Sequence, residues 1–545
     1  MSRAAPSIRL GGSRTLGVAL IPIAFLGLFF AWPLAAIVWR GVAPDGTPDL
    51  PALVEIVADD RWWRVAWFTT WQAALSTLAT LAVGLPVAGV LANRYVPGAG
   101  LLRGFFTVPF VMPTVVVATA FLAVFDALGG FGERWRESVA AIIVAHVFFN
   151  VAVVVRTVTD PWSRLDPGVE DAARMLGRSA WSTTLGVTLP RLRAPIAAAA
   201  SLVFLFSFTS FGVVLLLGGP GRTTLEVETY VQTTAFLRLD VAAVLAMLQL
   251  LIVVGLLTVQ RRAGAAVVSD QIRSEDRRRP HRSWRERCST AFVLGAVLAF
   301  IGTPMAVLVT RSFRADGWSL DNYRALGDTP SISLVSPAEA IRASLTIAAW
   351  SSLVAVIVGG LTSAAIVYGH GRAAKWLDGA LMLPLGTSAV TLGFGMLIAL
   401  DEPPLDLRAS AALVPIAHAL IGVPFVIRLM VPAIRSIDDR HREAALLLGT
   451  SPWATWLRVD LPIVWRGLTA ATAFAFAVSL GEFGATAFLV RPDRPTVPTM
   501  IVRLIGRPGA TNFGQAMAMA TILMVLTMVA VAAIERARVG DRGDF

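Results

Sequence analysis

The sequence predicts an all-α polytopic membrane protein made of two tandem, parallel six-helix repeats, with about twelve transmembrane helices in total. Three observations lead to this class. Of the 545 residues, 56% are hydrophobic and only 15% are charged, whereas a soluble domain averages about 25% charged residues. Apolar runs long enough to cross a bilayer recur along the whole chain. One polar stretch between them occurs twice, about half a chain apart.

The repeated stretch reads DAARMLGRSAWSTTLGVTLP over 171–190 and EAALLLGTSPWATWLRVDLP over 443–462. Gly177 stands opposite Gly449, 272 residues later, and this offset is kept along the stretch. The same offset pairs Asp171 with Glu443, Trp181 with Trp453, Leu189-Pro190 with Leu461-Pro462, His146 with His418, and Arg156 with Arg428. Further upstream the offset is 275, which pairs Ser76 with Ser351, Leu78 with Leu353, and Gly84 with Gly359. One module is therefore written twice.

Each copy predicts a helix, a glycine bend and a second short helix. In the first copy Asp166 is a good N-cap and Pro167 suits the first helical position. Gly177 is expected to end the helix as a C′ glycine. Ser179 can cap the second helix, which we expect Pro190 to close.

The second copy repeats this plan, with Ser451 before Pro452 where the second helix starts. Both copies are too polar to span a bilayer, and both carry paired alanines, Ala172-Ala173 and Ala444-Ala445. Small side chains let another surface approach closely. We therefore interpret each copy as a docking element, and the alternative is an ordinary cytoplasmic loop with good helix caps.

Twelve apolar runs of spanning length follow one another along the chain. The first, about Leu16 to Val38, has no clear A-x-A cleavage site, so we interpret it as a retained helix and not as a removed signal peptide. The runs of the first module fall near 16–39, 66–92, 103–125, 138–158, 194–216 and 240–259. Those of the second fall near 290–310, 343–367, 376–400, 411–433, 466–490 and 513–533.

The arginines predict the orientation. The net charge is +11 and arginine supplies nearly all of the positive charge. A basic chain can indicate a nucleic-acid partner, but these arginines gather in the gaps between apolar runs, which favours membrane topology and no nucleic acid. With twelve spans, both termini and both repeated loops fall on the arginine-rich, cytoplasmic side. The segment 491–512, expected outside, breaks the trend with four arginines. We divide the chain into a first transmembrane module (1–260), a basic cytoplasmic linker (261–289) and a second transmembrane module (290–545).

Several kinds of chemistry are excluded. Lys375 is followed by Trp376, so the chain has no P-loop and is not expected to be an ATPase or another enzyme. No metal-binding signature or cofactor motif is present, and Cys288 is the only cysteine, which excludes an intrachain disulfide. The matched His146 and His418 could line a path, although a structural hydrogen bond is the favoured interpretation.

The fifth span of each module is unusual for its glycines and small polar residues, over 204–221 and 474–490. Such residues permit close helix packing or a helix break. An acid within apolar sequence is costly unless it is paired or wet. Glu482 is therefore either a path-lining carboxylate or part of an interhelical ion pair or gating contact, and the sequence leaves both open. The candidate translocation path comprises Asn150, Ser207, Ser210, Phe211, Glu482 and Phe483.

The pattern of E-A-A, a later glycine and a terminal L-P resembles the EAA loop of ABC-importer permeases. The first copy departs from it, with Asp171 where the motif has Glu. The resemblance implies the type I importer permease fold, with two cytoplasmic coupling helices that dock on a dimer of a separate ABC ATPase. It assigns the coupling role to Glu170, Asp171, Ala172, Ala173, Gly177, Leu189, Pro190, Glu443, Ala444, Ala445, Gly449, Leu461 and Pro462.

Further stretches resemble particular importers. AHVFFN (145–150) and the run 208–250 are similar to the fused permeases of thiamine importers. EFGATAFLVRPDRPTVP (482–498) is similar to the fused iron(III) permeases as well. The resemblance implies a bacterial inner-membrane location, an extracytoplasmic solute-binding protein and thiamine as the solute, with iron(III) as the alternative.

Two other classes compete with this interpretation. A secondary transporter with two six-helix halves would explain the repeat, but not two EAA-like loops, and it would normally need more intramembrane ionisable groups. A channel is disfavoured because no filter-like polar ring is evident. A neighbouring coding region for a P-loop ATPase and a binding protein would separate the importer from both.

Overall fold

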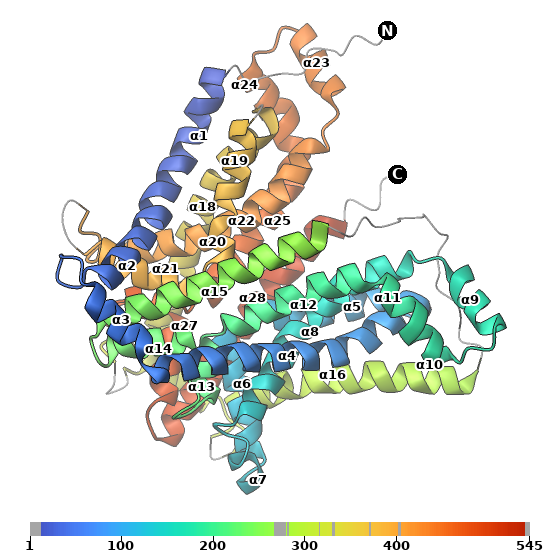
Figure 1. The fold of residues 1–545 in the computed structure, drawn as a ribbon, viewed down its shortest axis with the longest axis horizontal. Coiled ribbons are helices and arrows are strands. Elements are labelled where there is room, and N and C mark those ends of the chain that lie inside the picture. The colour runs from blue at the N-terminus through green and yellow to red at the C-terminus, as the bar shows by residue number, and fades with distance from the viewer. Residues whose placement is uncertain are drawn as a thin grey trace. The chain divides into compact units, whose positions relative to one another are not determined.

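The computed structural model describes residues 12–265, 280, 283–315, 317–329, 333–369, 372–401 and 405–539. Within these ranges the chain is helical and contains no β-strand, which confirms the all-α class (Figure 1). The predictions for the far ends of both termini and for most of the linker fall on 1–11, 266–279, 281–282 and 540–545, which lie outside the described residues.

Nine helical segments of the described chain are long and apolar enough to cross a membrane, and three bent helix pairs raise the number to as many as twelve. The predicted number of spans agrees with this upper count. The nine are Gly17–Val42, Asp60–Asn93, Val139–Ser163, Leu239–Thr258, Trp284–Ser312, Pro337–Tyr368, Leu413–Arg435, Trp456–Gly481 and Ala510–Ile534.

The third span of each module, expected as one apolar run over 103–125 and over 376–400, is bent. Helices α5 (Ala99–Val111) and α6 (Thr114–Ala127) meet at 98°. In the second module, Trp376–Gly386 and Ala389–Ala399 meet at 99°. The first bend follows from Pro113, since the residue before a proline is held in an extended conformation. At the second bend Ser388 caps the new helix α21 (Ala389–Ala399). Hydropathy detects neither signal, because both segments remain apolar throughout.

The helices gather into two compact units that are not continuous in sequence. One comprises the described residues of Met1–Ile56, Thr229–Met247 and Leu320–Phe545, and the other those of Val57–Glu228 and Leu248–Ser319. Three of the four unit boundaries fall within α3 (Leu50–Ala58), α14 (Leu225–Thr234) and α15 (Leu239–Ala265), and the fourth, between residues 319 and 320, lies outside any helix.

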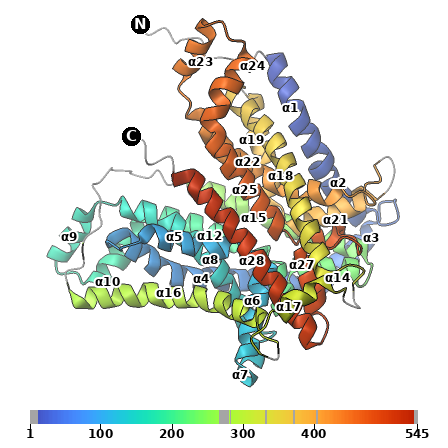
Figure 2. The same ribbon diagram turned by 180° about the vertical axis from the view of Figure 1, so that it is seen from behind.

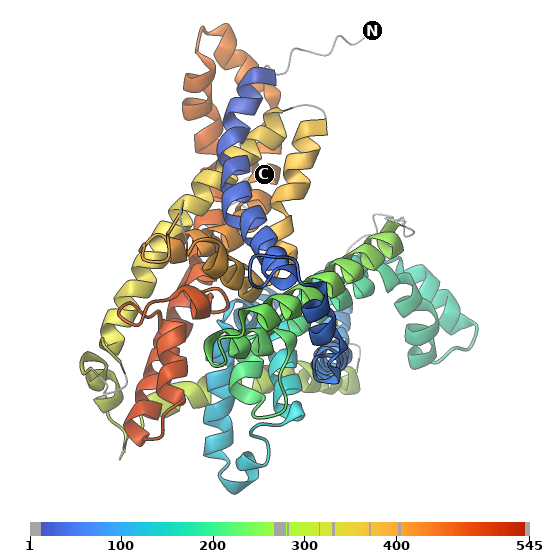
Figure 3. The same cartoon turned by 60° about the vertical axis from the view of Figure 1, so that its left-hand side comes forward.

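The first helix of each module belongs to the unit built mainly from the other module. Helix α1 (Gly12–Leu26) packs on α18 (Pro337–Tyr368), as the blue and yellow ribbons of Figure 3 show. Ala19 of α1 is buried in the same apolar cluster as Ala355 and Val358 of α18. Helix α16 (Trp284–Ser312) packs on α6 and on α4 (Asp60–Asn93). The sequence modules and the compact units are thus different divisions of one chain.

The core of each unit is a bundle of three long helices. In the first-module unit these are α4, α8 (Val139–Ser163) and α12 (Arg193–Phe208), which bury Val154, Trp162 and Val203 between them. In the second-module unit they are α18, α22 (Leu413–Arg435) and α25 (Leu461–Gly481), seen from behind in Figure 2. The remaining long helix is α28 (Ala510–Val539), and the shorter ones are α2 (Trp32–Val42), α7 (Gly130–Glu133), α17 (Asp321–Arg324), α19 (Arg372–Leu381), α20 (Leu383–Gly386) and α27 (Val497–Ile505).

A glycine at the same place in each bundle lets two helices approach closely. A methyl group placed on Gly84 of α4 would lie 2.7 Å from Cβ of Val154 on α8. One placed on Gly359 of α18 would lie 2.7 Å from Cγ1 of Val426 on α22. Since Gly84 and Gly359 are matched in the repeat, both modules pack their second and fourth spans by the same contact.

Replacing Gly359 with leucine is expected to force α18 away from α22, because a side chain there has no room. Overpacking of this kind costs about 1–3 kcal/mol. The thermal midpoint of the purified permease, followed by fluorescence, should fall clearly. Gly360→Leu is the matched control, since nothing lies within 4 Å of a methyl group at that position. Equal midpoints for the two variants would contradict this account of the packing.

Candidate functional site

The first repeated loop folds as its caps predict. Helix α9 (Pro167–Met175) begins after Asp166, whose Oδ1 accepts a hydrogen bond from the Gly168 amide at 2.8 Å. The helix ends at Met175, and Gly177 two residues later turns the chain with φ +84°. The amide of Arg178 then donates to the carbonyl of Ala173 at 3.2 Å, which closes the C-terminal turn.

The second loop forms the same bend. Helix α23 (Asp439–Leu447) is followed by Gly449 at φ +79°, and the Thr450 amide donates to the Ala445 carbonyl at 3.2 Å. A side chain in this left-handed region costs about 1–2 kcal/mol. Both predicted C′ glycines are therefore confirmed, and the backbone conformation is the reason for glycine at each.

The segments after the two bends begin alike. Ser179 Oγ accepts from the Ser182 amide at 3.2 Å, and Ser451 Oγ accepts from the Ala454 amide at 3.2 Å, so both serines cap their helices. The short helices α10 (Ala180–Thr183) and α24 (Pro452–Thr455) each pass into a π-helical turn, over 184–188 and 456–460. Single π turns are rare and often lie at functional sites.

Pro190 does not close the second short helix, and this expectation was wrong. Leu189-Pro190 begins α11 (Leu189–Arg191), and Leu461-Pro462 begins α25. Proline is tolerated in the first turn of a helix, where its missing N–H leaves no bond unmade. The modules then differ. The first turns by 76° between Arg191 and Arg193, whereas the second continues as one helix to Gly481.

Each loop exposes two neighbouring apolar side chains just before its glycine bend. Met175 and Leu176 are 88% and 87% exposed, and the matched Leu447 and Leu448 are 88% and 85% exposed. The alanines differ within each pair, because Ala172 and Ala444 are exposed, Ala173 is half-buried, and Ala445 is 9% exposed. Leu189 and Leu461 are half-buried, as are Glu170, Asp171 and Glu443, while Pro190 and Pro462 lie at the starts of their helices.

A side-chain pair braces each loop, and of the four residues involved only Glu170 was among the predicted site residues. In the first loop, Thr188 Oγ1 donates to Glu170 Oε1 at 2.6 Å. In the second, Arg442 Nε donates to Asp460 Oδ1 at 2.9 Å. Arg442 and Asp460 occupy the positions of Glu170 and Thr188 in the repeat. The same contact is therefore an ion pair in the second loop and a hydrogen bond from a hydroxyl to a carboxylate in the first. The 272-residue offset, which pairs Glu170 with Arg442 and Thr188 with Asp460, is the sequence signal that could have indicated the second brace.

A tyrosine ties the second brace to the end of a spanning helix. Tyr368, the last residue of α18, donates to Asp460 Oδ2 at 2.8 Å and accepts from Arg442 Nη2 at 3.0 Å. Both charged side chains of this brace are buried. The second loop is thereby fixed to α18 and to the start of α25 at once.

Both fifth spans are broken, which is one of the two outcomes that their glycines and small polar residues permit. Helix α12 ends at Phe208, and α13 (Gly212–Leu217) follows three residues later. Helix α25 ends at Gly481, and α26 (Thr486–Leu489) follows. The candidate path residues at and near these breaks, Asn150, Ser207, Ser210, Phe211, Glu482 and Phe483, are all buried.

The Glu482 carboxylate is held on several sides within its own unit. Its oxygens accept hydrogen bonds from the Ala485 amide at 2.8 Å, the Thr486 amide at 3.0 Å and Thr486 Oγ1 at 2.6 Å. Nε2 of His418 lies 3.1 Å from Glu482 Oε2, and its Nδ1 lies 2.8 Å from Ser479 Oγ. The carboxylate therefore joins the two parts of the broken span by hydrogen bonds, while a path-lining role stays a prediction.

The matched position in the first module holds a different polar cluster. Nδ1 of His146 lies 3.0 Å from Ser76 Oγ, so both matched histidines make a structural hydrogen bond. Asn150 Nδ2 donates to Ser207 Oγ at 3.3 Å, and Gln72 Nε2 donates to the Ser207 carbonyl at 2.9 Å. Because Ser210 stands where the second module has Glu482, no carboxylate at this position joins the two parts of the first module's broken span.

Replacing Glu482 with alanine is expected to destabilise the permease. Two buried amides, those of Ala485 and Thr486, would lose their acceptor, and each unmade bond costs about 1–3 kcal/mol. The thermal midpoint of the purified protein should therefore fall together with solute uptake. Loss of uptake at an unchanged midpoint would instead assign Glu482 to the path. Glu443→Ala, which removes a carboxylate that is not buried, is the control for the midpoint.

No group of three histidine, cysteine, aspartate or glutamate side chains in the described ranges could hold a metal ion. The two modules share three features: a polar loop with an exposed apolar pair, a glycine bend after that pair, and a broken fifth span.

The model of the family "Binding-protein-dependent transport system inner membrane component" matches this chain twice, over residues 81–261 and 344–539. The chain belongs to that family, as a fused form with two copies of the domain. It is thus the multi-pass inner-membrane permease of a binding-protein-dependent ABC importer, and such subunits are not themselves enzymes.

Individual relatives align along nearly the whole chain. The thiamine transport system permease protein ThiP of Brucella abortus (strain 2308) is 27% identical over 503 residues, which cover 89% of this chain and 90% of that protein. ThiP of Escherichia coli (strain K12) is 27% identical over 545 residues, which cover 96% and 95%. A probable ABC transporter permease protein of Sinorhizobium fredii is 25% identical and covers 96% of each chain.

Proposed function

We propose that this chain is the permease of a thiamine importer. The observation that supports it is similarity to thiamine permeases through both modules, over 89–96% of the chain in the two ThiP proteins above. The permease would receive thiamine from an extracytoplasmic binding protein and release it into the cytoplasm.

Uptake of labelled thiamine by a strain that lacks this gene tests the solute. We expect uptake to be lost in the deletion strain and restored by the chain, with labelled iron(III) uptake unchanged. Restored iron(III) uptake without thiamine uptake would overturn the proposal in favour of an iron(III) importer. If the deletion strain loses uptake of neither thiamine nor iron(III), the chain transports another solute.

We propose further that ATP is hydrolysed by a separate cytoplasmic ATPase dimer, with one subunit docked on each repeated loop. The exposed pairs Met175-Leu176 and Leu447-Leu448 support this, because a protein in contact with water rarely leaves four such side chains bare at two matched sites. The glycine bends at Gly177 and Gly449 would fix the angle between the docked helix and the span behind it.

Cysteine labelling tests the proposed orientation, with both loops and both termini in the cytoplasm. Single cysteines at Met175 and Leu447, both well exposed, are placed in a Cys288→Ser background because Cys288 is itself exposed. A membrane-impermeant maleimide should label neither in intact cells and both after permeabilisation. A cysteine at Leu334, expected outside, should react in intact cells. Labelling of either loop from outside would reverse the topology.

A further inference from the structure

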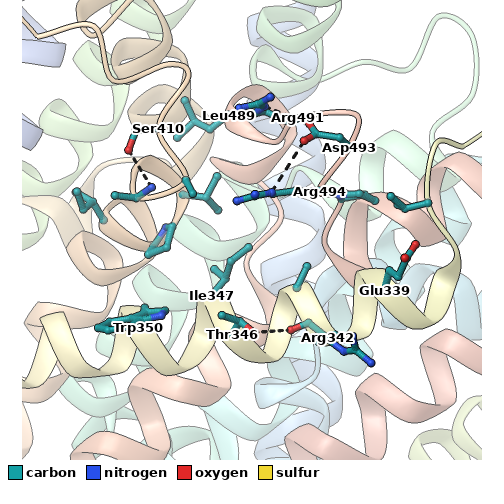
Figure 4. Close-up of a pocket in the computed structure, with 18 of the residues that line it drawn as sticks. Glu339, Arg342, Thr346, Ile347, Trp350, Ser410, Leu489, Arg491, Asp493 and Arg494 are labelled. Carbon is teal, nitrogen blue, oxygen red and sulfur yellow. Dashed lines mark hydrogen bonds and ion pairs between the residues drawn. The ribbon is translucent and has the colours of Figure 1, made fainter.

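A groove of about 720 Å³ opens on the unit built mainly from the second module. Its walls are the N-terminal half of α18, residues 410–416 at and before the start of α22, and residues 489–495 from the end of α26 onward (Figure 4). All three walls belong to one compact unit. Neither the coupling loops nor the broken span contributes its proposed functional residues to this groove.

The groove is charged at one end and apolar along the rest. Arg342 stands near the start of α18, and Ile347, Trp350 and Val354 follow it along the lining. At about 1.5 Å per residue, this sequence extends roughly 18 Å along the helix. Pro415 and Ile416 line the groove from α22.

The arginines of the segment after α26 have different tasks. Arg491 is tied down, since it donates to the Ala409 carbonyl at 3.0 Å and pairs with Asp493 at 3.1 Å. In the first module Arg222, which matches Arg494 in the repeat, donates to the carbonyl of Glu137, which matches Ala409. In the second module Arg491 makes this contact instead, so it does not occupy Arg494. The side chain of Arg494 is 64% exposed, lies 4.0 Å from Asp493, and extends over the groove in Figure 4.

The two carboxylates at the charged end are already engaged. Glu339 accepts from the Ser336 amide at 2.8 Å in the capping box of α18. Asp493 is shared between Arg491 and Arg494. The guanidinium of Arg342 makes no ion pair or hydrogen bond with any residue that the structure describes. The charged end therefore has an excess of positive charge available to an anion.

The apolar end lies on a membrane-spanning helix that faces outward. Trp350 of α18 is 57% exposed, and Leu353 and Ile357 one and two turns further along are exposed as well. Tryptophan is enriched where hydrocarbon meets the headgroups. From this arrangement we propose that the groove binds an anionic phospholipid. The phosphate contacts Arg494 and Arg342, and an acyl chain lies along Ile347, Trp350 and Val354.

Other occupants fit less well. Thiamine and iron(III) are cations, so an arginine-rich end repels them. A water-soluble protein, such as a binding protein, could cover the charged end, but the apolar end runs into the hydrocarbon where that protein cannot follow. Only a lipid places a charged headgroup at the charged end and an apolar chain at the apolar end, in the order in which these ends follow along α18.

Native mass spectrometry of the full-length, delipidated permease tests this inference. Added phosphatidylglycerol should bind about tenfold more tightly than phosphatidylcholine, since two arginines near the phosphate each favour an anionic headgroup. The double change Arg342→Gln and Arg494→Gln should abolish this preference. Trp350→Ala should weaken both lipids alike. Arg324→Gln is the matched control, because it removes an exposed arginine of the same unit away from the groove and should change nothing.

Three outcomes would overturn the inference. One is equal binding of the two lipids by the unaltered permease. Another is full displacement of phosphatidylglycerol by inorganic phosphate, which would make this a site for free anions. A third is a double variant that keeps its lipid preference and loses capture of the binding protein, which would make the groove a protein contact. Thiamine uptake is not the readout, so failure of the proposed solute would leave this result standing.

Discussion

Replacing Leu447 and Leu448 with serine is expected to leave the permease inserted in the membrane and to abolish solute-stimulated ATP hydrolysis in the assembled importer. Both side chains are almost fully exposed, so their loss removes little of the permease's own packing. Apolar anchors at the centre of an interface can each contribute 2 kcal/mol or more, and losing two of them should prevent capture of the ATPase. The measurements are pull-down of the ATPase subunit and ATPase activity in liposomes with binding protein and solute.

The matched change in the first loop, Met175→Ser with Leu176→Ser, is expected to have the same effect. Leu334→Ser is the control, since it removes an exposed leucine from the segment expected on the opposite side of the membrane. Normal stimulation in both double variants, at normal permease levels, would end the proposal that these loops dock the ATPase.

Arg442→Ala is expected to uncouple the importer with Leu447 and Leu448 still in place. Removing one partner leaves Asp460 buried and uncompensated, which costs about 3–5 kcal/mol, and releases the second loop from Tyr368. The loop should become sensitive to limited proteolysis, and solute-stimulated ATPase activity should fall by at least tenfold.

The first module supplies the matched control for this brace. Arg442→Glu combined with Asp460→Thr recreates the pair that Glu170 and Thr188 form in the first loop. This double variant should recover protease resistance and part of the activity. If Arg442→Ala alone keeps normal stimulation and resistance, the brace has no part in coupling.

Much of the loop geometry could be predicted because it is encoded locally. Asp166, Ser179, Gly177 and Gly449 act on residues within one turn of themselves, so their types already determine the caps and bends. Pro190 was misread for the same local reason, since a proline fits after one helix and at the start of the next equally well.

Contacts between distant residues could not be read in this way. The brace joins Tyr368 to Asp460, and nothing in the residues around either one indicates the other. Glu482 could be recognised as unusual, but the sequence could not show that amides of its own broken helix and His418 would satisfy it. The bends of the third spans escaped because hydropathy measures composition and not direction.

The membership of α1 in a unit with α18 sets an order of events during synthesis. Ribosomes add about 5–20 residues per second, so α1 leaves the ribosome roughly 15 to 60 seconds before its partner helix exists. For that time its face around Ala19, buried in the finished protein, must be covered by lipid or by the insertion machinery. Helix α16 has no such wait, because α4 and α6 precede it. The unit made of residues 57–228 and 248–319 can therefore be completed first during synthesis. Helix α1, although it is made earliest, packs only after α18 has been synthesised.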